Sequence, residues 1–249
     1  MEPWVLAALI AAPFVGSFLG TLVLRLPEGL PVVAGRSACP ACGTRLGPRD
    51  LVPLLSWAIL RGRCRHCGTA VPSFYPAIEL AALGVALWAW MVAGGVALLA
   101  SCLLGWGLLA LALIDRRHFL LPDALTLPLL AAGLGVTALL DPPSLPAHAI
   151  GAAAGYLAFA GIAALYRRVR GRDGLGLGDA KLLAAGGAWL GWSALPGVVL
   201  VAALLGILEV LVARLAGGAP LAAARPIAFG TWLAAAIWLV WLYGPPLPG

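Results

Sequence analysis

Long apolar runs with few charges recur along most of the chain and determine its predicted architecture. A hydrocarbon core about 30 Å thick requires about 20 apolar residues per helix. Runs of roughly that length predict an all-α, polytopic membrane protein with about eight transmembrane helices. Continuous Leu, Ala, Val and Gly, without alternation of polar and apolar residues, argue against a membrane β-barrel. The predicted spans lie near residues 5–24, 77–92, 96–114, 124–140, 147–166, 180–190, 195–213 and 227–243.

Composition and charge placement add an orientation to this picture. Of 249 residues, 62% are hydrophobic and 10% are charged, too few charges for the surface of a soluble protein of this size. All 16 Lys and Arg fall in alternate connections between spans, so the positive-inside bias places those connections in the cytoplasm and both termini outside. The net charge of +6 therefore needs no nucleic-acid partner. The cations lie within residues 25–65, 116–117, 167–181, 214 and 225.

The same positive-inside bias decides whether residues 180–213 form one span or two. A single tilted helix over residues 180–213 would place Arg214 and Arg225 outside, whereas a break at 191–196 keeps them on the cytoplasmic side. The first span shows no small-residue cleavage site followed by a polar chain, so we expect it to stay attached. We expect three parts: a first transmembrane helix (1–24), a cytoplasmic loop (25–75) and a seven-helix membrane domain (76–249).

Four cysteines in the long polar loop form two CxxC turns typical of a zinc site. The turns are about 20 residues apart, and each is followed by Gly, which lets backbone amides approach the sulfurs. Four thiolates leave no open coordination position, so we expect a structural Zn²⁺. A disulfide framework is the alternative, but the cytoplasm keeps thiols reduced. Cys102 is expected only to pack, and the predicted ligands are Cys39, Cys42, Cys64 and Cys67.

Two aspartates at the ends of predicted spans are the candidates for chemistry. Asp115 ends the third span and Asp179 begins the sixth, at the same cytoplasmic face. Ionisable residues beside spanning helices are costly and are functional candidates by default. Two facing carboxyl groups that share a proton can hydrolyse a peptide, one activating water and one donating a proton. Gly176 and Gly178 would let an extended substrate backbone approach Asp179.

Simpler roles for these acids stay open at this point. Either aspartate could cap a helix or pair with a neighbouring Arg116, Arg117 or Lys181. Glu79, one turn into the second span, could line the same cavity as the aspartates or pair with a loop arginine. Glu209 stands alone in the seventh span, and we expect at most a supporting role for it.

Short motifs occur in a fixed order over almost the whole chain. They are Gly16-Ser-Phe-Leu19 with Arg25-Leu-Pro27, the two CxxC turns, Pro53-Leu-Leu-Ser-Trp57 with Arg61-Gly-Arg-Cys64, Tyr75-Pro76 with Glu79, Asp115, Leu121-Pro-Asp123, Gly176-Leu-Gly-Asp179 with Lys181-Leu-Leu183, and Phe229-Gly230. In these residues the chain resembles the type IV prepilin peptidases, a family of aspartic membrane proteases with a GxGD motif. Their order and spacing together make the resemblance specific.

The resemblance implies two activities at a bacterial inner membrane. Asp115 and Asp179 would cleave the basic leader of prepilins or pseudopilins after a glycine on the cytoplasmic side. Methylation of the new N-terminus with S-adenosylmethionine is associated with the cysteine loop. Lys181 and Asp123 would be supporting residues, whereas no residue is assigned to the methyl donor.

The chain departs from the family pattern at two places. Arg116-Arg117 stands where relatives commonly carry another acid, and Phe74 stands where an arginine often precedes Tyr-Pro. A peptidase without methyltransferase activity is therefore an alternative. From other classes, a proton-coupled transporter and a scaffold organised by the zinc loop are alternatives. A transporter that passes protons from acid to acid would need acids spread through the membrane depth, whereas the acids of this chain cluster at one edge.

Overall fold

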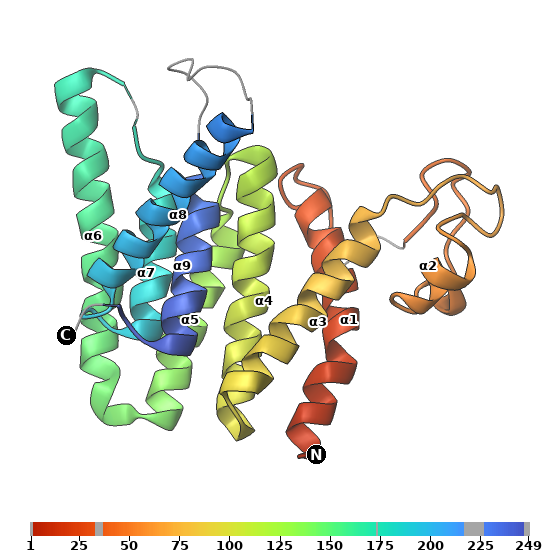
Figure 1. The fold of residues 1–249 in the computed structure, drawn as a ribbon, viewed down its shortest axis with the longest axis horizontal. Coiled ribbons are helices and arrows are strands. Elements are labelled where there is room, and N and C mark those ends of the chain that lie inside the picture. The colour runs from red at the N-terminus through yellow and green to blue at the C-terminus, as the bar shows by residue number, and fades with distance from the viewer. Residues whose placement is uncertain (1, 33–36, 173, 217–226, 247–249) are drawn as a thin grey trace. The chain divides into compact units, whose positions relative to one another are not determined.

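The computed structural model describes residues 2–32, 37–172, 174–216 and 227–246, and it is helical with two isolated β-bridges in the cysteine loop. The chain divides into two compact units, residues 1–106 and 107–249. The three-part division expected from the sequence stays a prediction, and the predicted cytoplasmic Arg225 lies outside the described residues. Figure 1 labels the elements.

The first unit joins two long helices to the cysteine loop. Helix α1 (Pro3–Arg25) packs on α3 (Phe74–Val92), and the short elements η1 (Pro48–Asp50) and α2 (Leu55–Ile59) belong to the loop. The two long helices touch closely at Gly16, where an added Cβ would lie 2.6 Å from Cα of Glu79. Helix α4 (Gly95–His118) begins in this unit, and its Trp106 donates to the carbonyl of Ala82 over 2.9 Å. The isolated Cys102 is buried, as predicted.

The second unit is a helical bundle with α7 (Leu177–Leu190) at its centre. Helix α7 contacts α5 (Asp123–Leu140), α6 (Leu145–Arg170), α8 (Leu195–Leu215) and α9 (Phe229–Tyr243). A one-turn helix, η2 (Pro142–Ser144), links α5 to α6. Small residues allow the closest contact, because a Cβ on Gly151 would lie 2.7 Å from the carbonyl oxygen of Gly187. Trp189 then donates to the Leu129 carbonyl over 2.8 Å.

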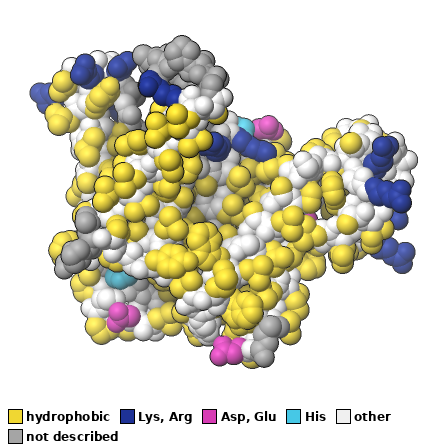
Figure 2. Space-filling view, in the orientation of Figure 1, with side chains coloured by type: hydrophobic (Ala, Val, Ile, Leu, Met, Phe, Trp, Pro, Cys, Tyr) yellow, Lys and Arg dark blue, Asp and Glu magenta, His cyan; other side chains and the backbone are white. Residues whose placement is uncertain are grey.

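Each predicted span corresponds to a helix in the described part of the chain. Six helices there are long and apolar enough to cross a membrane: α1, α3, α4, α5, α6 with η2, and α8. Helices α7 and α9 have 14 and 15 residues, so the total of eight spans stays a prediction. In the second unit, Figure 2 shows hydrophobic side chains along the length of the visible helices. Lys and Arg gather where α6 and α8 end.

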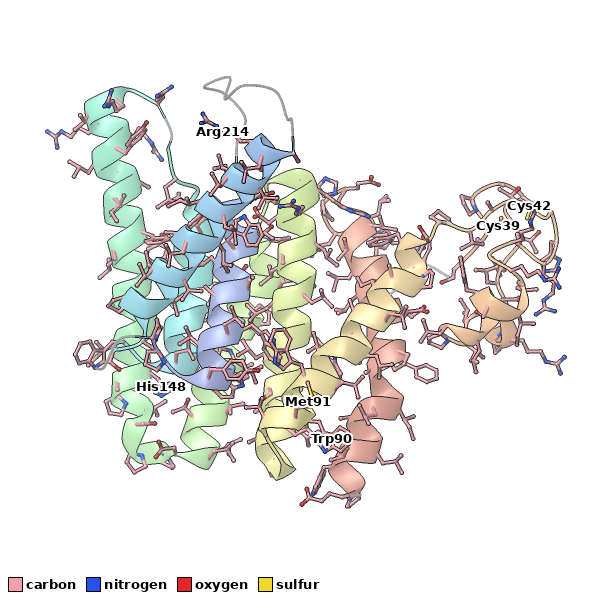
Figure 3. All side chains as sticks on the ribbon, viewed as in Figure 1. Cys39, Cys42, Trp90, Met91, His148 and Arg214 are labelled. Atoms are coloured by element: carbon pink, nitrogen blue, oxygen red, sulfur yellow. The ribbon has the colours of Figure 1, made fainter. Side chains whose placement is uncertain are left out.

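The two ends of the second unit differ in chemistry. Arg214 lies at one end and His148 at the other, as Figure 3 shows. His148 Nδ1 lies 3.2 Å from Thr137 Oγ1 and 3.0 Å from the carbonyl oxygen of Ala188, so it ties together α5, α6 and α7. These contacts give His148 a packing role.

Candidate active site and metal-binding loop

Asp115 lies near the end of α4 and accepts hydrogen bonds from the start of α9. The residue is 5% exposed, and its Oδ2 receives the backbone N–H of Thr231 over 2.7 Å. The first turn of any helix leaves its N–H groups without partners within the helix. Asp115 supplies one of these partners, and the N-terminal end of the α9 dipole favours negative charge at that place.

The hydroxyl of Thr231 can serve both protonation states of Asp115. Thr231 Oγ1 lies 3.2 Å from Oδ2 of Asp115 and 3.1 Å from the carbonyl oxygen of Ala112. A hydroxyl has one proton to donate and lone pairs to accept. It can therefore donate to an ionised Asp115, or donate to Ala112 and accept from a protonated Asp115. The motif Phe229-Gly230 pointed to this turn, but sequence reasoning missed Thr231.

Asp179 lies in the first turn of α7, directly after the glycines of the GxGD motif. Its backbone N–H donates to the Gly176 carbonyl over 3.1 Å, and a Cβ on Gly176 would lie 3.4 Å from Oδ2 of Asp179. Asp179 is half-buried, and the charge of Asp115 acts on it. The structure thus brings the two predicted catalytic residues within electrostatic reach of each other.

Leu121 connects the surroundings of the two acids. A Cβ on Gly178 would lie 3.0 Å from Cβ of Leu121, and a Cβ on Gly230 would lie 2.8 Å from its Cδ1. The same Cβ on Gly230 would lie 3.0 Å from the carboxyl group of Asp115. Glycine at both positions therefore keeps Leu121 packed beside the acids without crowding them.

Two of the nearby cations bind other acids. Lys181 Nζ lies 2.6 and 2.8 Å from the two carboxyl oxygens of Asp123, and Arg116 lies 2.6 Å from Oε1 of Glu209. These ion pairs therefore argue against the alternative that Arg116 or Lys181 neutralises Asp115 or Asp179. Lys181 and Asp123 fix the start of α7 against the start of α5, which gives both supporting residues a positioning role.

Two glutamates have partners that the sequence did not indicate. Glu209 does not stand alone, because it pairs with Arg116 and accepts the indole N–H of Trp232 over 2.7 Å. Glu79, for which a loop arginine was one of two roles considered, accepts the backbone N–H of Leu54 over 2.7 Å. Long-range packing created these partners, and helical spacing could not reveal them. Glu79 belongs to the first unit, so its sharing of a cavity with the aspartates stays a prediction.

The four predicted metal ligands form one cluster in the cysteine loop. Their sulfurs all lie within 4.8 Å of one another, and Cys39 Sγ is 3.8 Å from Cys67 Sγ. A tetrahedral zinc site with bonds of about 2.3 Å has sulfur–sulfur edges of about 3.8 Å. All four cysteines are free thiols, so the structure does not support the disulfide alternative. Figure 3 shows Cys39 and Cys42 on this compact loop.

The two CxxC turns repeat the same local geometry. Cys39 and Cys64 each accept a backbone N–H from the glycine four residues later, and both glycines have positive φ. A threonine follows each glycine. The hydroxyl of Thr69 lies 3.3 Å from Cys67 Sγ, and this hydrogen bond is the main cause that lowers the pKa of Cys67 to about 6. At Cys67 the turn therefore favours the thiolate form that metals bind.

Comparisons with known proteins cover both units. Residues 10–93 match the Bacterial Peptidase A24 N-terminal domain, and residues 102–211 match the Type IV leader peptidase family. No solved structure matches the chain.

Three relatives carry the same description, prepilin leader peptidase/N-methyltransferase. The protein from Burkholderia pseudomallei (strain K96243) is 43% identical, over 96% of this chain and 85% of the relative. The protein from Dickeya chrysanthemi is 43% identical, over 93% and 89% of the two chains, and that from Pseudomonas aeruginosa is 39% identical, over 97% and 91%. The chain therefore belongs to the type IV leader peptidase family.

Proposed function

We propose that this protein removes the leader from prepilins or pseudopilins as an aspartic endopeptidase, with Asp115 and Asp179 as its catalytic pair. The observation that carries the proposal is the packing of both acids and their flanking glycines around Leu121, with Arg116 and Lys181 paired to other acids. Family membership supports the reaction class. The site would cleave at the cytoplasmic face of a bacterial inner membrane, with both termini on the opposite side.

In the proposed hydrolysis, Asp115 and Asp179 share one proton. One ionised aspartate takes a proton from water, whose oxygen attacks the scissile carbonyl carbon, while the protonated aspartate donates to the carbonyl oxygen. The C–N bond then breaks, and the leaving amine takes a proton from the pair. Gly176 and Gly178 leave room for an unwound substrate backbone beside Asp179. The apolar stem of the substrate would enter from the bilayer as a helix.

A second activity, N-methylation of the cleaved substrate, is proposed from the relatives' names. S-adenosylmethionine would supply the methyl group. The new N-terminal amine forms the N–C bond as the donor's C–S bond breaks, and the amine's proton passes to solvent. Zn²⁺ on Cys39, Cys42, Cys64 and Cys67 would be structural, because four thiolates leave no position for a substrate.

Replacing either aspartate tests the peptidase. We expect Asp115→Asn and Asp179→Asn to abolish leader removal, because an amide can neither activate water nor share the proton. Asp141→Asn, an identical change at an exposed position after α5, should leave it unchanged. Mass spectrometry of a prepilin incubated with enzyme and S-adenosylmethionine reports cleavage and methylation together. Full cleavage by Asp179→Asn would refute the proposal, and cleavage without methylation by the unmodified enzyme would leave a peptidase alone.

A further inference from the structure

A cavity of about 280 Å³ lies within the first unit, between α1, α3 and the cysteine loop. Its volume is near the lower end for small-molecule sites, which begin at about 300 Å³. The wall includes Cys39 and Cys64, so the fold of the metal-binding loop determines the shape of the cavity. The catalytic aspartates belong to the other unit, and nothing in their chemistry uses this cavity.

One wall of the cavity carries the carboxyl group of Glu79. This side chain lies in the spanning helix α3 and is 6% exposed, and a buried acid in such a helix marks a functional site by default. Its Oε2 accepts the N–H of Leu54 over 2.7 Å, and the carboxyl group is also hydrogen-bonded to Ser17. An amide could accept that hydrogen bond at a lower desolvation cost, so anchoring the loop does not explain a carboxylate. A carboxylate also keeps lone pairs for a ligand.

Aromatic and cationic groups line the same cavity. The rings of Trp57 and Tyr75 form part of the wall. The indole N–H of Trp57 donates to the Val71 carbonyl over 3.3 Å, and a Cβ on Gly62 would lie 2.9 Å from the ring, so the ring has a fixed place. Arg25 and Arg63 also line the cavity. Asp50, paired with Arg65 over 2.7 Å, is a second acid in the wall. Carboxyl groups, two aromatic residues and guanidinium groups therefore surround one small space.

We propose that this cavity is the binding site for S-adenosylmethionine, an inference that rests on the methyltransferase part of the proposed function. The donor combines a flat base, a ribose with two hydroxyls, a sulfonium cation and a carboxylate. Trp57 and Tyr75 offer faces for the base or the cation. Glu79 is the acceptor for the cation or for the ribose hydroxyls, and the guanidinium groups suit the carboxylate.

Binding to the purified full-length protein tests the assignment. Isothermal titration would measure the affinity for S-adenosylmethionine, with the zinc content of each variant determined in parallel. We expect Glu79→Gln to weaken binding at least tenfold while its zinc content stays unchanged, because Gln keeps the acceptor for Leu54. Glu28→Gln, the same change at an exposed site outside the cavity, should bind like the unmodified protein.

A second pair of variants tests the cavity without touching a charge. Ser56→Phe would fill the space, and we expect loss of binding. Leu55→Phe on the same short helix serves as its control, because Leu55 is 61% exposed and does not line the cavity.

The outcomes separate the two proposals. An unmodified protein that neither binds nor uses S-adenosylmethionine would remove the methyltransferase proposal and this inference with it. If the unmodified protein binds and methylates, unchanged affinity in both Glu79→Gln and Ser56→Phe would overturn the cavity assignment alone. Loss of zinc together with loss of binding in both variants would assign these residues to anchoring the loop, and would also overturn it.

Discussion

The carboxyl group of Asp115, a proposed catalytic acid, also holds α4 against α9. It occupies the last part of α4 and satisfies a backbone N–H at the start of α9, over 2.7 Å. A catalytic acid, the role we propose for Asp115, needs a fixed position. Here the position comes from a helix terminus that itself requires an acceptor. Thr231 adds a hydroxyl within reach of the same oxygen.

Thr231→Val tests whether this hydroxyl positions Asp115. Valine has nearly the same shape but loses the hydroxyl, whereas the backbone N–H bond to Asp115 remains. A hydrogen bond to a charged group contributes about 1.5–3 kcal/mol. We therefore expect the rate constant for prepilin cleavage to fall roughly 10- to 100-fold.

Two further variants separate positioning from stability. Thr231→Ser should recover most of the activity, because it restores the hydroxyl. Thr137→Val, whose lost hydroxyl contacts His148 at the other end of the unit, should change cleavage little. Cleavage by Thr231→Val at the unmodified rate would show that the backbone N–H alone suffices.

At the scale of elements, the cysteine loop depends on its two matching turns. Only the short helices η1 and α2 lie between the turns, and one isolated bridge closes each turn, so this segment has little secondary structure to stabilise it. Binding a structural zinc ion contributes folding free energy directly, because the unfolded chain offers no preformed site. The same loop lines the proposed methyl-donor cavity.

Removing the metal should therefore unfold the loop and spare the membrane helices. We expect Cys39→Ser, or treatment with a chelator, to lower the zinc content and to speed tryptic cleavage at the loop arginines. Methylation should fall more than leader cleavage in the same samples. Cys102→Ser, at a buried cysteine outside the cluster, should keep its zinc. Full zinc content and unchanged protease resistance in Cys39→Ser would contradict this prediction.

For the molecule as a whole, the number of membrane crossings depends on the two short helices, α7 and α9. Helix α7 is the shorter. Its 14 residues extend only about 21 Å, less than a bilayer core. However, α7 lies along α5, which is a candidate span. Near one end Lys181 of α7 binds Asp123 of α5, and near the other His148 links Ala188 of α7 to Thr137 of α5. Buried on nearly all sides, α7 does not itself face lipid along its length.

A topology reporter placed after Ser193 tests this interpretation. If α7 crosses the membrane, the turn between α7 and α8 lies outside, and an alkaline phosphatase fusion there should be active. A fusion after His66 in the cysteine loop should be inactive, because we place that loop in the cytoplasm. An inactive fusion at Ser193, with an active fusion at the C-terminal end, would show that the protein has fewer than eight spans.

The sequence alone determined the helical membrane class and the cysteine cluster, and it singled out the two aspartates as candidates. Apolar length, CxxC spacing and acids at span ends are local patterns, and local patterns follow directly from bilayer thickness, ligand geometry and the cost of buried charge. Phe229-Gly230 marked the turn that meets Asp115, although its chemistry was not readable.

Only the tertiary structure decided which groups meet. Thr231 reaches Asp115 across 116 positions of sequence, and Lys181 reaches Asp123 across 58. Arg116 pairs with Glu209, an acid that appeared isolated along the chain. The physical reason is that helical periodicity fixes which face a side chain occupies, whereas packing between helices selects the neighbour on that face.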